Sequence, residues 1–167
     1  MMKLEDFRKL NLLVTWTLID IGYKGSEIFQ DELSSNEIID YAISLLNNDN
    51  YLEEVAELSG ERAENTEEIN RYIKILSAYE KCDKDKEFEK WIMCYVNKNI
   101  QKKYENCIDG LMELGDIWLK LGMPKDSPHI FQGVDNSILP QEYYTMQNYE
   151  NLYQAHINWV KNKLSKM

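Results

Sequence analysis

The side chains of this chain best suited to metal or acid–base chemistry are two histidines, His129 and His156, and three cysteines. The histidines are too far apart for the H-x-x-x-H spacing of a zinc-binding helix, and neither has the preceding glutamate of an E-x-x-H di-iron bundle. Cys82, Cys94 and Cys107 are spaced 12 and 13 residues apart, which fits neither a C-x-x-C pair nor a disulfide framework. We therefore expect reduced, partly buried thiols, no metal site and no cofactor.

The surroundings of the two histidines favour structural roles over catalysis. His156 falls on an apolar stripe between Tyr153 and Val160, where we expect a hydrogen-bonded core histidine. His129 follows Pro128 in an irregular segment, and we expect it at the surface. The sequence also lacks the G-x-S-x-G elbow, the P-loop and the G-x-G-x-x-G turn that acyl-transfer, nucleotide and dinucleotide chemistry use. The sequence thus points to no catalytic residue.

Carboxylates dominate residues 27–68, which hold thirteen acids and a single base, Arg62. The chain's formal charge of −10 comes from its first 85 residues, because the remainder holds ten acids and ten bases. Glu53, Glu57 and Glu61 follow one another at intervals of four and share a face wherever a helix continues. A hydrolytic pair needs one acid in an apolar pocket that raises its pKa, whereas these acids have polar neighbours. The pattern predicts a solvated acidic face.

Such an excess of negative charge opposes folding unless a partner compensates for it, because like charges four apart on a helix repel each other. A basic protein would be attracted to this face. A nucleic acid would not, since phosphate binding needs a basic stripe. The alternative is that the charge only keeps the protein soluble. The partner-binding residues that we predict are Asp49, Glu53, Glu54, Glu57, Glu61, Glu64 and Glu68.

Apolar periodicity and capping residues predict helices along most of the chain. From Leu4 to Gly22 the pattern fits one broken helix or two short ones, with Thr15 as an N-cap and Gly22 as the stop. Ser34 and Glu37 have the spacing of a capping box and should start the next helix. Prolines and glycine interrupt any period over 123–141, so we expect the longest loop there, with one helical turn at most. Further helices are expected over 51–60, 65–79, 88–96, 111–121 and 149–164.

The composition favours an all-α protein. The 167 residues fit one core, and glycine (7) and proline (3) are scarce. We expect a single helical domain over 1–167, a compact bundle of six to eight helices in which antiparallel pairs can stack. No apolar run approaches the roughly 18 residues of a membrane span, and the N-terminal segment is charged, so we expect a cytoplasmic protein. The predicted core includes Trp16, Ile39, Ile43, Ile73, Trp91, Ile92, Trp118, Ile157 and Val160.

Four segments carry a family resemblance: LVTWTLIDIGYKG, SNEIIDYAISLL and YLEEVAELSG in the first half, and CIDGLMELGDIWLKLGMPKDSPHIF in the second. They resemble an uncharacterised bacterial family, domain of unknown function 2247. The resemblance implies a compact helical bacterial protein in the cytoplasm, and it implies no activity or functional residue. In size, acidity and aromatic content the chain is also similar to immunity proteins that neutralise bacterial toxins.

Three hypotheses for function follow. The first is a non-enzymatic, acidic protein-binding module, such as an immunity protein that neutralises a basic bacterial toxin. The second is a hydrolase or transferase with a carboxylate or tyrosine site near the 123–141 loop. The third is an oligomeric structural protein. The identity of the partner and the oligomeric state stay open.

Overall fold

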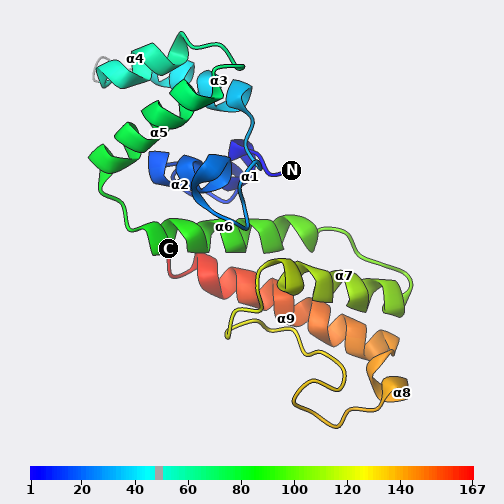
Figure 1. Cartoon of the computed structure of the whole chain (residues 1–167). Helices are drawn as coiled ribbons and strands as arrows, with labels where there is room; N and C mark the ends of the chain where they lie inside the picture. The colour runs from blue at the N-terminus through cyan, green and yellow to red at the C-terminus, as the bar shows by residue number, and fades with distance from the viewer. Residues whose placement is uncertain (48–50) are drawn as a thin grey trace. The chain divides into compact units, whose positions relative to one another are not determined.

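The computed structural model describes residues 1–47 and 51–167, and every regular element within them is a helix (Figure 1). The predicted all-α class is confirmed. Contacts divide the chain into two compact units, Met1–Trp91 and Ile92–Met167, and each is described by itself. The single domain over 1–167 stays a prediction. The described residues form nine α-helices, one more than the predicted six to eight. The additional helix is a four-residue turn late in the chain.

The first unit consists of short helices and one longer one. They are α1 (Leu4–Lys9), α2 (Trp16–Asp20), the π-helical turn η1 (Ile21–Gly25), α3 (Ser35–Leu45), α4 (Glu53–Ser59) and α5 (Thr66–Glu80). Helix α2 packs on α5, and α4 packs on both α3 and α5. Helix α6 (Lys84–Asn99) begins in this unit and ends in the second, because the division falls after Trp91.

The starts of α2 and α3 follow local capping chemistry, as the sequence predicts. The Thr15 hydroxyl accepts a hydrogen bond from the Leu18 N–H at 3.0 Å, and the Ser34 hydroxyl accepts one from the Glu37 N–H at 3.3 Å. The Glu37 carboxylate does not close the capping box. It accepts a hydrogen bond at 2.6 Å from the N–H of Leu4, in the first turn of α1. One of the chain's many acids is therefore used inside the fold.

Gly22 does not stop α2, and this prediction is wrong. The helix continues through η1 to Gly25, and Gly22 is buried against the indole ring of Trp91, where a β-carbon would collide with the ring. Trp91 is fully buried and donates a hydrogen bond from Nε1 to the Leu18 carbonyl at 2.8 Å. Its ring also meets Phe7 edge-on and stacks on Phe29. The glycine is needed for close packing rather than for a turn.

Two other predictions about burial in this unit are wrong. Ile43 is 48% exposed, because the buried stripe of α3 runs through Ile38 and Ala42 and leaves Ile43 on the outer side. The apolar spacing of the predicted 65–79 helix places Leu76 and Tyr79 on one buried stripe, and Leu76 is buried, but Tyr79 is 58% exposed. Both errors arise because the apolar pattern is wider than the contact that the neighbouring helices provide.

The second unit is built on α7 (Cys107–Lys120) and α9 (Met146–Leu164), which pack together, with the short α8 (Pro140–Tyr143) before α9 (Figure 1). The predicted irregular segment lies between α7 and α8. Gly122, at φ +72°, turns the chain out of α7 in the left-handed region that favours glycine. The remaining predicted core residues are buried or half-buried: Trp16, Ile39, Ile73, Trp91, Trp118 and Val160 are buried, and Ile92 and Ile157 are half-buried.

His156 is the core histidine that the sequence predicts. It is fully buried, and Trp118 Nε1 donates to its Nε2 at 2.6 Å. Because indole only donates, Nε2 must be unprotonated, so the proton sits on Nδ1 and is donated to the Leu152 carbonyl at 2.6 Å. Burial lowers the pKa of His156, so the ring is neutral at pH 7. Cys82, Cys94 and Cys107 are not joined by disulfides, and their side chains are half-buried, buried and half-buried.

Candidate functional site

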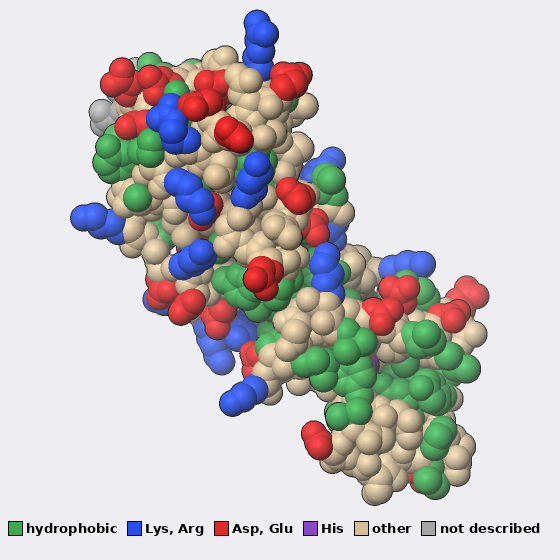
Figure 2. Space-filling model, viewed as in Figure 1, with side chains coloured by type: hydrophobic (Ala, Val, Ile, Leu, Met, Phe, Trp, Pro, Cys, Tyr) green, Lys and Arg blue, Asp and Glu red, His purple; other side chains and the backbone are tan. Residues whose placement is uncertain are grey.

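The predicted partner-binding carboxylates lie on α4, on the start of α5 and on the connection between them. We call this set the acidic surface. Asp49 falls outside the described residues and is left out of it. Glu53, Glu57, Glu64 and Glu68 are exposed, and Glu54 and Glu61 are half-buried. Glu67, which was not among the predicted site residues, is exposed in the same place. Figure 2 shows red side chains over this part of the first unit with blue ones among them, so the surface is acidic but not uniformly so.

Helix dipoles account for four of these carboxylates. Glu53 and Glu54 lie in the first turn of α4, and Glu67 and Glu68 in the first turn of α5. A negative charge is favourable there, because the unpaired N–H groups give a helix start a partial positive charge. Glu68 is also paired, with its Oε2 at 2.7 Å from Arg71 Nη2. These four acids therefore have reasons for their positions within the fold.

Glu57, Glu61 and Glu64 have weaker reasons within the fold. Glu57 lies near the end of α4, where the helix dipole disfavours a negative charge. Glu61 accepts a hydrogen bond from the Asn65 amide at 2.8 Å, which leaves its charge uncompensated. In the part of the chain that the structure describes, no lysine or arginine forms an ion pair with these three carboxylates. Because no cation of the described fold pairs with them, the charges of these three carboxylates are available to an external cation.

The shape and the electrostatics of the region agree with such a role. Residues 64–68 line a hollow of about 460 Å³ at the start of α5. Burial raises the pKa of Tyr72 on α5, and so do the charge of the Glu57 carboxylate and a side-chain hydrogen bond with it. Arg71 acts in the opposite direction, and Glu61 adds a smaller increase. The negative field of Glu57 and Glu61 therefore reaches the α5 side of the surface. The arrangement can attract a cation, and it offers no acid in an apolar pocket for hydrolysis.

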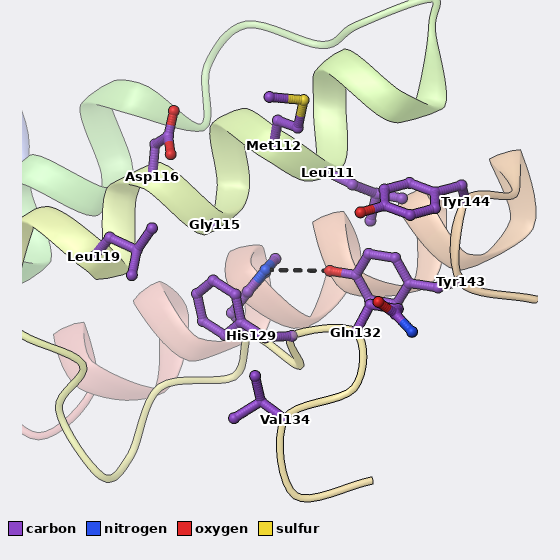
Figure 3. Close-up of a pocket in the computed structure, with 11 residues that line it drawn as sticks. Leu111, Met112, Gly115, Asp116, Leu119, His129, Gln132, Val134, Tyr143 and Tyr144 are labelled. Carbon is purple, nitrogen blue, oxygen red and sulfur yellow. Dashed lines mark hydrogen bonds between the residues drawn. The ribbon is translucent and has the colours of Figure 1, made fainter. Parts of the chain in front are cut away.

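A second candidate site lies beside the segment that the enzyme hypothesis names. A cleft of about 240 Å³ opens between α7 and the segment that follows it, and we call it the α7 cleft (Figure 3). Its lining is mostly apolar and includes four groups capable of acid–base chemistry, of which His129 and Tyr143 are buried. The lining residues are Leu111, Met112, Gly115, Asp116, Leu119, His129, Phe131, Gln132, Val134, Tyr143 and Tyr144.

The prediction that His129 lies at the surface is wrong. Its side chain is 8% exposed, because the segment folds back onto α7 at Gly115, where a β-carbon would come within 3.3 Å of His129 Nε2. The ring packs edge-on against Phe131 at 4.4 Å between centroids and lies 5.6 Å from the ring of His156. The histidine is buried because its segment approaches α7 closely at Gly115, which has no side chain.

The protonation of the His129–Tyr143 pair follows from its hydrogen bonds. The Tyr143 hydroxyl donates its only proton to the Ile130 carbonyl at 2.8 Å, so its oxygen can only accept from His129 Nε2, at 3.4 Å. Nδ1 of His129 is then unprotonated, and this buried atom has no hydrogen-bond partner among the described residues. Burial, with a smaller contribution from His156, lowers the pKa of His129 to about 4.

This pair is poorly suited to general acid–base catalysis. A general base works best with a pKa near the working pH, and burial moves His129 well below it. No carboxylate orients the ring, since Nδ1 is unpartnered within the described residues. Burial also raises the pKa of Tyr143, so its phenol stays protonated. Both groups are neutral at pH 7, so they are better suited to line a pocket for an apolar group than to react.

Sequence reasoning placed His129 at the surface and did not identify Tyr143 or Gly115 as residues of a site. The available signal was Gly115 itself, because a glycine in the middle of a strongly periodic helix often marks a close approach by another segment. The length of the following loop was a second signal, since a long loop that carries aromatic residues must pack them somewhere. Neither signal tells which loop residue contacts the glycine.

A family model matches nearly the whole chain. Residues 4–164 match the model of a family described as an uncharacterized protein conserved in bacteria (DUF2247). The chain belongs to this family. The resemblance that the sequence segments indicated is confirmed. No curated protein and no solved structure matches this DUF2247 chain.

Within residues 1–47 and 51–167, no three histidine, cysteine, aspartate or glutamate side chains lie close enough together to hold a metal ion. Among the same residues, no helix combines the length and the apolar character needed to cross a membrane.

Proposed function

We propose that this DUF2247 protein is a non-enzymatic module that binds a basic protein through the acidic surface. The observation that supports the proposal most is the position of Glu57, Glu61 and Glu64. The three residues lie at the end of α4 and on its connection to α5, none is in an ion pair among the described residues, and Glu57 lies at the end of α4 that disfavours a negative charge. Charges placed against the local electrostatics are better explained by a partner than by folding.

The physical consequence is electrostatic steering. A cluster of like charges raises the local concentration of an oppositely charged protein and speeds its association, an effect that added salt screens. Neutralisation by the partner would also remove the repulsion between the glutamates. Because exposed charges act mainly on the association rate, an additional contact has to slow dissociation.

The enzyme hypothesis has a location but no activated group. The α7 cleft lies beside the 123–141 loop, as that hypothesis requires, and it contains Tyr143 and Asp116. His129 and Tyr143 are both neutral at pH 7, however, and neither is prepared to donate or accept a proton in a reaction. The binding hypothesis is therefore better supported.

Site-specific photo-crosslinking in the native bacterium tests the proposal. A photoreactive amino acid such as p-benzoylphenylalanine replaces Glu57 in one strain and Glu64 in another. Matched control strains carry it at Glu27 or Asp40, which are exposed acids of the same unit outside the acidic surface. We expect a basic protein to be crosslinked from positions 57 and 64 only. Equal crosslinking from all four positions, or none from any, would contradict the proposal.

A toxin domain is one partner with the required charge, and co-expression tests that narrower version. The product of a neighbouring gene is expressed with the wild-type protein or with the E53Q/E57Q/E61Q/E64Q variant. If the partner is a basic toxin, the wild type restores growth and the variant does not. A control with the same loss of charge, E27Q/D40N/D85N/E105Q, should protect like the wild type, since these acids lie elsewhere. Full protection by the four-glutamine variant would exclude the acidic surface as the contact.

A further inference from the structure

The outer face of α7 carries an apolar stripe that the fold does not cover. Ile108, Met112 and Leu119 are 46%, 59% and 58% exposed. The stripe continues across the α7 cleft to Val134 and Tyr144, which are 55% and 41% exposed. Figure 2 shows green side chains gathered over this part of the second unit. An apolar patch with a concave centre is characteristic of a contact surface.

The cleft at the centre of this patch has the size of an anchor pocket. Its volume of about 240 Å³ lies below the roughly 300 to 1,000 Å³ of pockets that hold cofactors and drug-sized ligands. Gly115 lies on the α7 side of the cleft, with Phe131 and His129 packed against it, and neutral His129 and Tyr143 line the opposite side (Figure 3). Such a pocket suits one large apolar side chain, the kind of group that dominates protein–protein binding energy.

Acidic residues run along the same helix beside the apolar stripe. Asp109, Glu113 and Asp116 are exposed and follow one another at helical spacing, and Asp116 reaches the rim of the cleft. No described lysine or arginine forms an ion pair with these three carboxylates. Lys120, the lysine of α7, lies over the Tyr95 ring at 4.6 Å instead. Figure 2 shows red side chains next to the green ones over α7.

We propose that the α7 cleft is a docking site for a segment of a partner protein that has a large apolar residue, such as tryptophan, flanked by lysine or arginine. The apolar residue enters the cleft beside Gly115, and the flanking cations lie along Asp109, Glu113 and Asp116. Charge complementarity selects this occupant over an apolar segment without cations, because three carboxylates would otherwise be left beside the interface. The site is on the second unit and does not depend on the acidic surface of the first.

A peptide titration followed by NMR tests the site on the full-length protein. The probe is a pentapeptide with tryptophan between two pairs of lysines, blocked at both ends. Two matched peptides replace the tryptophan by alanine or the lysines by glutamate. The signals to follow are the methyl group of Met112 and the amide of Gly115. We expect the probe to shift both signals and to bind about tenfold more tightly than either matched peptide.

Variants separate the apolar from the electrostatic contribution. M112Q/L119Q removes apolar side chains that are already exposed, and D109N/E113Q/D116N removes the charges, so neither disturbs the core. Each should weaken binding of the probe by about tenfold. Leu13, 74% exposed on the first unit, provides the control L13Q, which should bind like the wild type.

Several outcomes would overturn the inference. One is absence of shifts at Met112 and Gly115 at millimolar probe, and another is equal binding of the alanine peptide, which would leave the cleft unused. Tryptamine binding as tightly as the probe would make the site a small-molecule pocket. Loss of binding in E57Q/E61Q/E64Q alone would move the peptide to the acidic surface, supporting the proposed function while refuting the docking site. Unchanged binding in that variant would show that the probe does not bind the acidic surface, as the docking site in the α7 cleft requires.

Discussion

Protonation of His129 should destabilise the protein as the pH falls, and the size of the effect follows from its burial. The perturbation is a change from about pH 7 to pH 5 in the wild type and in H129Q, which replaces the imidazole with a polar group that does not titrate. Glutamine can still donate a hydrogen bond toward the Tyr143 oxygen. The two proteins then differ mainly in one titrating group.

The sign and magnitude come from the pKa of His129, about 4 in the fold against 6.5 for an ordinary histidine. Because the unfolded chain binds the proton more tightly, the free energy of unfolding is highest above pH 6.5 and falls as the pH drops from there toward 4. Each pH unit in this window changes the free energy by about 1.4 kcal/mol per group. By pH 5 the wild type should lose about 2 kcal/mol that H129Q retains.

Urea unfolding at a series of pH values, followed by tryptophan fluorescence, measures this difference. Burial also lowers the pKa of His156, which adds acid sensitivity to both proteins. Burial raises the pKa of Glu80, which acts in the opposite direction, because its folded form takes up a proton first. Both contributions largely cancel when the free energies of wild type and H129Q are subtracted.

Parallel pH profiles for the two proteins would refute the reasoning. They would mean that His129 gains its proton as easily in the folded state as in the unfolded state, so that the ring is hydrated rather than packed between Phe131 and Gly115. A difference that grows as the pH rises would contradict the sign. Either result would also contradict the conclusion that His129 lines the α7 cleft as a neutral ring.

Two substitutions in the first unit test its packing. G22A should lower the free energy of unfolding by about 1–3 kcal/mol, because the new methyl group collides with the Trp91 ring. The control G60A, whose β-carbon would have its nearest neighbour at 3.6 Å, should change the free energy by less than about 1 kcal/mol. Equal effects of the two substitutions in urea unfolding would contradict this packing. K90M should cost about 3–5 kcal/mol, because Glu87 is 7% exposed and loses the ammonium group at 2.7 Å. Removing both charges in E87Q/K90M should restore part of that loss, and a double variant as unstable as K90M would show that the buried pair is not the cause.

Features fixed by neighbouring residues could be predicted from the sequence. Thr15 and Ser34 cap their helices through groups only three residues away, and the terminal helix follows from its own apolar stripe. The amount of negative charge in the first half is likewise a matter of composition. Such features need no knowledge of tertiary contacts, which is why the all-α class and most helix positions were within reach.

Features fixed by distant residues could not be predicted. Gly22 looks like a helix stop until Trp91 packs on it, and His129 looks exposed until the loop reaches Gly115. Several acids also serve as backbone acceptors: Glu80 accepts from Trp16 N–H at 2.6 Å, and Glu37 accepts from Leu4 N–H. Sequence alone does not separate carboxylates that accept from backbone N–H groups from those, like Glu57, that do not. The structure is needed to identify which acids of the stretch form a candidate binding surface.

The affinity of the partner that crosslinks from positions 57 and 64, measured by calorimetry at increasing salt, tests the central claim most directly. The account predicts that the affinity of the wild type falls steeply with salt, and that E57Q/E61Q/E64Q binds about tenfold more weakly with a flatter salt dependence. Equal affinity and equal salt dependence for the two proteins would contradict the claim that these three carboxylates meet a cationic partner.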